Sequence, residues 1–205
     1  MRLQHITALL ISGVQAVPLA AQSAEQAHPA VVSYGTLNQN DLALRAKNED
    51  VEIRFVPLDG RVTNLMANDA FQSLRSLVES RDRSIDSVAS RAGVAVPGLA
   101  LVSFFGLRPD TRFDPQTLTV RVRNRALQPI GIIPINARFT SHQLQQREQA
   151  SAIYLFEESL PVDDAFTVAY GVLSSDDWHS KQDMMNRERA RISGRTRSPT
   201  RDTTP

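Results

Sequence analysis

The chain has 205 residues, of which 23 are basic, 22 are acidic and 41% are hydrophobic, and it contains no cysteine. This length suits one compact domain, and the hydrophobic content is too high for a disordered chain. The near balance of charge provides no overall attraction to polyanions, which argues against nucleic acid as the main partner. Without cysteine, the chain can form neither disulfides nor thiolate metal sites, and it has no residue for the acyl anchor of a lipoprotein.

The first 23 residues have the layout of a secretory signal peptide. Arg2 supplies a positive start, residues 6–17 are apolar, Pro18 follows, and small residues come next at positions 20, 21, 23 and 24. The apolar run is shorter than the roughly 20 residues that span a bilayer. We therefore expect cleavage, a mature chain without a transmembrane helix, and a periplasmic or extracellular location. A signal anchor that is not cleaved and a buried N-terminal element are the alternatives.

Residues 24–40 are rich in Ala, Gln, Ser and Asn, and they predict a flexible lead-in. A short edge strand at residues 31–34 is an additional option within it. The domain itself is expected to cover residues 41–173.

Seven segments of this domain have the pattern of β-strands bounded by turn residues. They are residues 42–46, 51–55, 99–105, 118–122, 130–135, 152–156 and 166–172. Most alternate apolar and polar residues, whereas residues 99–105 are apolar on both faces, as in a central strand. This number and spacing predict a mainly β fold, an antiparallel sandwich of about seven strands, with a partly open barrel as the alternative.

One long helix is predicted over residues 69–92, inserted after the second strand. Its apolar positions share one helical face: Phe71, Leu74, Val78, Ile85, Val88 and Ala92. Asp69 and Gln72 have capping-box spacing, and Gly93 stands where a left-handed C-terminal cap belongs. We expect the apolar face to pack on a sheet; a coiled-coil seam is the alternative.

The strand pattern resembles that of the immunoglobulin-like sandwiches of exported bacterial proteins. The alternating segment Phe166-Thr167-Val168-Ala169-Tyr170 looks like their closing strand, and the resemblance covers residues 41–173. The Cys–Trp–Cys core of antibody-type domains is absent, so the resemblance implies a fold and no specific activity.

No catalytic motif is present in the sequence. There is no Gly-x-Ser-x-Gly elbow and no phosphate-binding glycine loop, and Ser141-His142 are adjacent, so their side chains point apart. Asp110 and Asp114 are weak candidates for a calcium site in a loop, although Arg112 between them favours ordinary solvated charge. No cofactor is expected.

Arg121, Arg123 and Arg125 follow the two-residue period of a strand, which would place them on one face. One interpretation is a basic stripe for an anionic partner, such as a lipid head group or an envelope polymer. The other is an exposed strand that its charges protect from self-pairing.

A C-terminal helix is predicted over residues 174–192, starting at Ser174 and Ser175 with acidic residues in its first turn. Trp178, Met185 and Ile192 recur every seven residues, and Trp178 is expected to anchor this helix to the sandwich; it is also a candidate partner contact. Residues 193–205 are expected to be a disordered basic tail.

These features favour an exported, non-catalytic accessory or interaction protein of the cell envelope. Its partner would be a protein or an anionic envelope component. The alternative is an enzyme or small-ligand carrier whose site is assembled from scattered loop residues.

Overall fold

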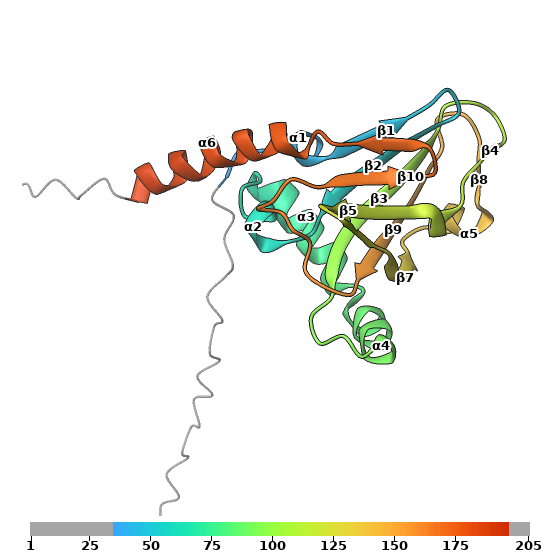
Figure 1. The fold of residues 1–205 in the computed structure, drawn as a ribbon, viewed down its shortest axis with the longest axis horizontal. Helices are drawn as coiled ribbons and strands as arrows, with labels where there is room; N and C mark the ends of the chain where they lie inside the picture. Colours follow the sequence, from blue (N-terminus) through green and yellow to red (C-terminus); the bar gives the residue numbers. More distant parts are fainter. Residues whose placement is uncertain (1–34, 197–205) are drawn as a thin grey trace, which may run out of the picture. The chain divides into compact units, whose positions relative to one another are not determined.

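The computed structural model describes residues 35–196 of the chain (Figure 1). The predicted signal peptide, the optional strand at residues 31–34 and the end of the predicted tail, residues 197–205, lie outside the described residues. Within the described part the protein is mainly β, with antiparallel sheets and several helices.

The larger sheet has five antiparallel strands in the order β1-β2-β3-β9-β7. These strands are β1 (Leu44–Lys47), β2 (Val51–Pro57), β3 (Gly98–Gly106), β9 (Gln149–Phe156) and β7 (Pro129–Pro134). The central strand β3 is the apolar segment 99–105 of the sequence, and most of its residues are buried, as that pattern predicts.

The smaller sheet has four antiparallel strands in the order β11-β10-β5-β6. They are β11 (Leu173–Ser175), β10 (Thr167–Tyr170), β5 (Leu118–Val122) and β6 (Arg125–Leu127). A separate pair joins β4 (Thr111–Arg112) to β8 (Gln143–Leu144). Each of the seven predicted segments therefore contains a strand, and β4, β6, β8 and β11 are additional short ones.

The two sheets share one hydrophobic core. Phe55, Phe104 and Tyr154 of the larger sheet belong to the same buried cluster as Val120 and Val168 of the smaller one, and Figure 1 shows β5 and β10 in front of β3 and β9. The sheets also approach each other at both edges, because β1 lies beside β10 and β11, and only Gln128 separates β6 from β7.

Two helices, α3 (Asn68–Glu79) and α4 (Asp82–Ala92), replace the single helix predicted over residues 69–92. The break falls at Ser80, whose hydroxyl donates to the carbonyl of Leu77 at 2.7 Å and competes with the helical pattern there. Within the same break, the Arg81 guanidinium donates to the carbonyl of Ile135, the residue after β7, at 3.3 Å. A contact between segments this far apart could not be inferred from local periodicity.

Most of the predicted apolar helix face is nevertheless in place. Phe71, Leu74 and Ile85 are buried, Val78 and Val88 are partly buried, and Ala92 is exposed. Gly93 adopts φ +70° and closes α4 as predicted, since a left-handed residue there favours glycine. The predicted cap of Asp69 with Gln72 is wrong: the helix begins at Asn68, and no side chain caps it.

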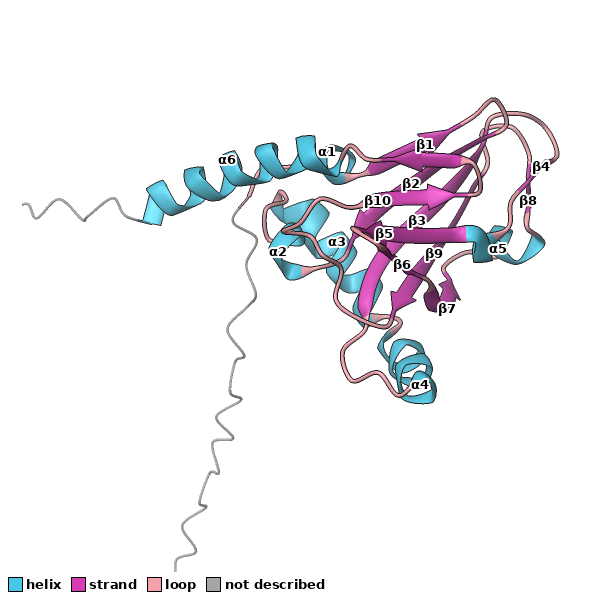
Figure 2. Cartoon of the chain, in the orientation of Figure 1, coloured by secondary structure: helices cyan, strands magenta, loops and turns pink. Residues whose placement is uncertain are grey.

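The C-terminal helix α6 (Trp178–Thr196) begins later than predicted, because Ser174 and Ser175 belong to β11. It also extends past the predicted end at residue 192, so residues 193–196 are helical. Figure 2 shows its C-terminal end extending away from the strands. The remaining short elements are α1 (Gln39–Leu42), α2 (Gly60–Thr63), the 3-10 turn η1 (Pro115–Thr117) and α5 (Arg138–Ser141).

A polar groove on the larger sheet as candidate ligand site

The outer face of the larger sheet, which points away from the shared core, changes character along its strands. One half is apolar, and there Ile133, Ile153 and Leu155 form a cluster with Ile85 of α4. The other half is polar: Ser151 lies two residues before Ile153 on β9, and strand alternation places both on the same face. The helices α3 and α4 therefore leave a polar surface beside the apolar surface that they cover.

Strand register assembles this polar surface from residues far apart in the sequence. Arg45 of β1 is opposite Arg54 of β2, Arg54 is opposite Ser103 of β3, and Ser103 is opposite Ser151 of β9. Neighbouring strands lie about 4.8 Å apart. The four side chains thus form one row across four strands.

Two buried serines form one end of this row. Ser103 and Ser151 are 7% and 6% exposed, and their hydroxyl oxygens are 2.8 Å apart. The amide Nε2 of Gln149 donates to Ser103 Oγ at 3.1 Å and to Ser151 Oγ at 2.8 Å. The bond between the serines uses one of the two hydroxyl protons, and the second proton has no acceptor among the residues that the structure describes. It is free to donate to a ligand.

Arg54, which is next to Ser103 in this row, is held in a fixed position. Its Nε donates to Glu52 Oε1 at 2.6 Å, and its guanidinium carbon lies 4.3 Å from the centre of the Phe105 ring. Its Nη1 reaches the side-chain oxygen of Asn40 at 3.5 Å, a long hydrogen bond, while Nη2 has no partner within residues 35–196. The salt bridge and the ring contact fix the guanidinium and leave donors on it unused.

A hollow of about 270 Å³, which we call the polar groove, lies over this part of the sheet. It is lined by Gln39, Asn40, Ala43, Arg54, Val56, Leu101, Ser103, Phe105 and Gln149. A second hollow of about 410 Å³ shares Arg54 and Phe105 with it and adds Arg147. The polar groove is near the lower end of the volumes typical of small-molecule sites, so it fits one small polar molecule rather than a large cofactor.

The polar groove offers recognition groups without an activated nucleophile. Neither serine hydroxyl contacts a histidine or a carboxylate in the described part of the chain, although nucleophilic catalysis by serine depends on such a base. The side chains whose pKa values are shifted lie elsewhere. Burial raises the pKa of Tyr154 and of Tyr170, and both hydroxyls bond backbone groups near η1.

The two predicted metal candidates have different hydrogen-bond partners. Asp110 accepts hydrogen bonds from the side-chain amides of Gln143 at 2.9 Å and Gln145 at 2.7 Å. Asp114 instead caps η1 by accepting from the backbone of Gln116 at 2.9 Å. Within residues 35–196, no group of three or more His, Asp or Glu side chains could hold a metal ion.

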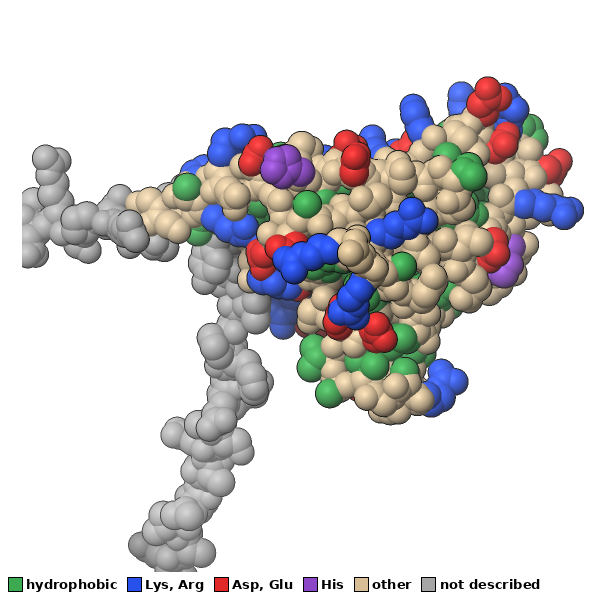
Figure 3. Space-filling view, in the orientation of Figure 1, with side chains coloured by type: hydrophobic (Ala, Val, Ile, Leu, Met, Phe, Trp, Pro, Cys, Tyr) green, Lys and Arg blue, Asp and Glu red, His purple; other side chains and the backbone are tan. Residues whose placement is uncertain are grey.

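The three arginines predicted to share a strand face do not lie on one strand. Arg121 ends up on β5, Arg123 is in the β5–β6 turn with φ +51°, and Arg125 starts β6. Arg123 pairs with Asp164 at 3.3 Å, and Arg125 pairs with Glu158 at 3.3 Å. Figure 3 likewise shows basic and acidic side chains next to each other over this face.

Trp178 is fully buried, so it anchors α6 as predicted and has no surface for a partner contact. Its Nε1 donates to the carbonyl of Val162 at 3.0 Å, and its ring lies 4.8 Å from that of Phe166. Met185 is buried one heptad further along, and Ile192 is partly buried against the same core.

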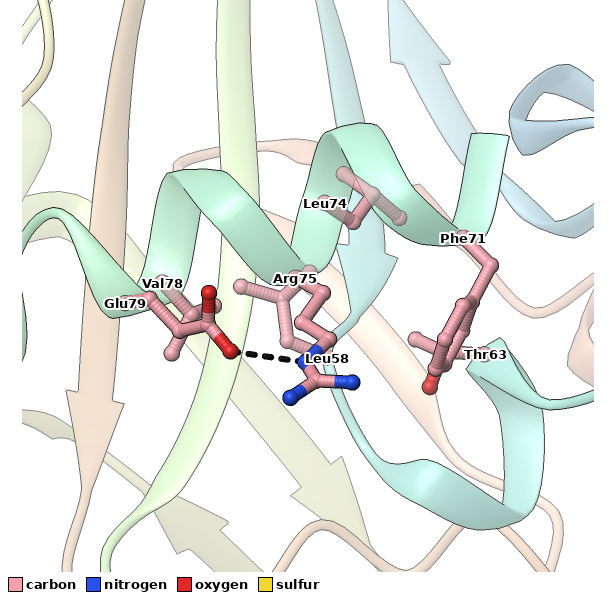
Figure 4. A pocket seen from close by; sticks show the side chains of 7 residues that line it. All are labelled: Leu58, Thr63, Phe71, Leu74, Arg75, Val78 and Glu79. Carbon is pink, nitrogen blue, oxygen red and sulfur yellow. Dashed lines mark hydrogen bonds and ion pairs between the residues drawn. The ribbon is translucent and has the colours of Figure 1, made fainter. Parts of the chain in front are cut away.

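An apolar pocket of about 180 Å³ lies between α2 and α3 (Figure 4). Phe71, Leu74 and Val78 line it, and an Arg75–Glu79 ion pair of 2.6 Å stands at its rim. These two charges neutralise each other, which leaves Thr63 as the one other polar side chain to orient a ligand. Specific sites use several convergent polar groups, so we regard the polar groove as the stronger candidate.

The polar groove was missed by sequence reasoning, although one signal for it exists. Ser103 is the one polar side chain between Leu99 and Phe105, a segment that the sequence predicts to be covered on both faces. A buried hydroxyl requires partners, and the sequence does not indicate that Gln149 and Ser151 supply them.

Comparison with protein-family models, with curated proteins and with solved structures found no match for the chain. No helix within residues 35–196 is long and apolar enough to cross a membrane. The case for a function therefore depends on the geometry of the polar groove.

Proposed function

We propose that the protein is an exported, non-catalytic binding protein of the cell envelope, and that it holds its ligand in the polar groove. The observation that carries this proposal is the pair of buried serines, 2.8 Å apart, with one hydroxyl proton unused. A serine hydroxyl that lines a hollow and has a proton left over can donate that proton to a ligand.

Binding rather than catalysis is supported by the chemistry of the groove. Its serines are hydrogen-bonded to each other and to an amide, which does not activate a nucleophile. An enzyme or a ligand carrier assembled from scattered loop residues is the alternative; the polar groove differs from that alternative in being built on strands, which hold binding groups more rigidly than loops do.

Export is supported by the layout of the first 23 residues, with a positive start, a short apolar run and small residues after it. The partner would be a protein or an anionic component of the envelope. An immunoglobulin-like sandwich is proposed for the scaffold, supported by two antiparallel sheets with one shared core.

The test is a titration of the full mature chain with single sugars, in which binding is monitored through the backbone amide chemical shifts. We expect shifts to concentrate on β2, β3 and β9 around Ser103, and we expect Ser103→Ala to reduce them. Ser73→Ala, at an exposed position of α3, is the matched control and should leave them unchanged. Shifts that survive Ser103→Ala unchanged would place the ligand elsewhere.

A further inference from the structure

Two arginines stand directly opposite each other on the outer face of the larger sheet, and one of them, Arg54, lines the polar groove. Arg45 of β1 and Arg54 of β2 are register partners, and like charges in this arrangement destabilise a sheet. Their nearest shared acceptor is the neutral side-chain oxygen of Asn40, 3.4 Å from Arg45 Nη2 and 3.5 Å from Arg54 Nη1. Repulsion between the two guanidinium groups is therefore only partly offset.

The carboxylates of the described chain neutralise only one member of this pair. Glu52 forms an ion pair with Arg54, but Arg45 has no ion pair with any carboxylate between residues 35 and 196. Lys47 adds a further positive charge, because it lies on the same face of β1 and opposite Glu52. Three basic side chains therefore face one acidic side chain at the β1–β2 end of the sheet.

The other end of the row is neutral. Ser103, Ser151 and Gln149 offer hydroxyl and amide groups there. Neutral donors and acceptors of this kind match the hydroxyl groups of a polyol. A ligand that satisfies both ends must carry an anionic group next to hydroxyl groups.

We infer that the ligand is a sugar acid whose carboxylate binds between Arg45 and Arg54 and whose hydroxyl groups bond Ser103, Ser151 and Gln149. This inference rests on the proposed function, since it names the ligand class of the same groove. The planar guanidinium fork suits a carboxylate. Arg45 positions the acid from the neighbouring strand, while Arg54 is fixed by Glu52 and Phe105.

The experiment is calorimetric titration of the mature chain with galacturonate, with galactose as the neutral analogue and inorganic phosphate as the other anion. Galacturonate should bind at least about tenfold more tightly than galactose, since a hydrogen bond to a charged group is worth more than a neutral one. Arg45→Gln and Arg54→Gln should each remove most of that preference.

Two features make the result decisive. Arg45 makes one long hydrogen bond within the described residues, so Arg45→Gln should fold normally even if Arg54→Gln does not. Arg83→Gln, at an exposed position of α4, is the control for the loss of one positive charge and should bind galacturonate as the unaltered chain does.

The outcomes separate this inference from the proposed function. Equal affinity for galacturonate and galactose, unchanged by Arg45→Gln, would overturn the sugar acid and leave the polar groove as a binding site. Phosphate binding more tightly than galacturonate would overturn the carboxylate. If neither sugar binds and no amide on β2, β3 or β9 shifts, the proposed function itself is wrong.

Discussion

At the scale of single residues, Glu188 is a buried charge that ties α6 to the start of the described chain. It accepts hydrogen bonds from the Thr36 backbone at 2.6 Å and the Thr36 hydroxyl at 3.0 Å, and it pairs with Arg191. The bonds from Arg191, followed by those from Thr36, lower the pKa of Glu188 from 4.5 to about 2, although burial acts in the opposite direction. The ionised carboxylate is thus the form that the fold favours.

Glu188→Gln should therefore lower the free energy of unfolding at neutral pH and flatten its dependence on pH in acid. Because the folded state has the lower pKa, the stabilisation from this group is complete above 4.5 and is lost as the pH falls toward about 2. Urea unfolding between pH 7 and pH 2 measures this. A variant whose acid profile parallels that of the unaltered chain would show that Glu188 is not the group responsible.

Leu74 is a buried side chain of α3 that borders the apolar pocket (Figure 4). Leu74→Ala should cost about 2–5 kcal/mol of unfolding free energy, as buried Leu to Ala substitutions do. We expect the lower part of that range, because the side chain already faces a hollow and has fewer contacts to lose. Ser76→Ala, exposed on the same helix, is the control for urea unfolding. A loss below about 0.5 kcal/mol would make α3 peripheral to the fold.

At the scale of elements, α4 lies unusually close to the edge strand β7. A Cβ atom placed on Gly131 would come within 2.3 Å of Val88 Cγ1, so no side chain fits between the two elements. Val88 is β-branched and stiff at its first torsion angle, which means that it cannot turn away easily. Glycine is required at this position of β7 for the helix to sit where it does.

Gly131→Ala should destabilise the fold by about 1–3 kcal/mol, the usual cost of forcing an extra carbon into a close contact. Gly60→Ala is the matched control, because a Cβ there would be 3.9 Å from the nearest atom, Asn64 Nδ2. Thermal unfolding of both variants gives the comparison. Equal midpoints would mean that α4 shifts freely along β7 and that Gly131 carries no packing constraint.

The sequence predicts the elements whose pattern is local to one segment, and it misses those that depend on contacts with distant segments. Strands such as β3 and β9 bury a long apolar run, and that pattern is local to each strand. Strands β4 and β8 have two residues each and pair only with each other, so no local sequence pattern predicts them. The polar groove belongs to the second kind, because the register of β2, β3 and β9 brings its residues together.

At the scale of the whole molecule, charge is distributed unevenly along the sequence. Residues 187–205 carry six arginines against Glu188 and Asp202, a local charge of +4, which leaves −4 on residues 24–186. Part of the opposite charge is paired within the described residues, since Arg189 forms an ion pair with Asp163 at 3.5 Å. A basic end on an acidic domain remains consistent with the anionic envelope partner that we propose.

Processing of the N-terminus is the prediction that concerns the entire chain. If residues 1–23 are a signal peptide, a signal peptidase should cut near the small residues at positions 20–24. The first helix of the described fold, α1, begins at Gln39, so cleavage there would leave every described element in the mature protein. Intact-mass measurement of the exported protein should therefore show a chain that starts between about residues 21 and 25.

Replacing Leu9 and Leu10 in the apolar run with arginine should block export and leave the full mass in the cytoplasm, because a charged run cannot act as a signal. Exported protein that retains Met1 would contradict the signal peptide and favour an anchor that is not cleaved.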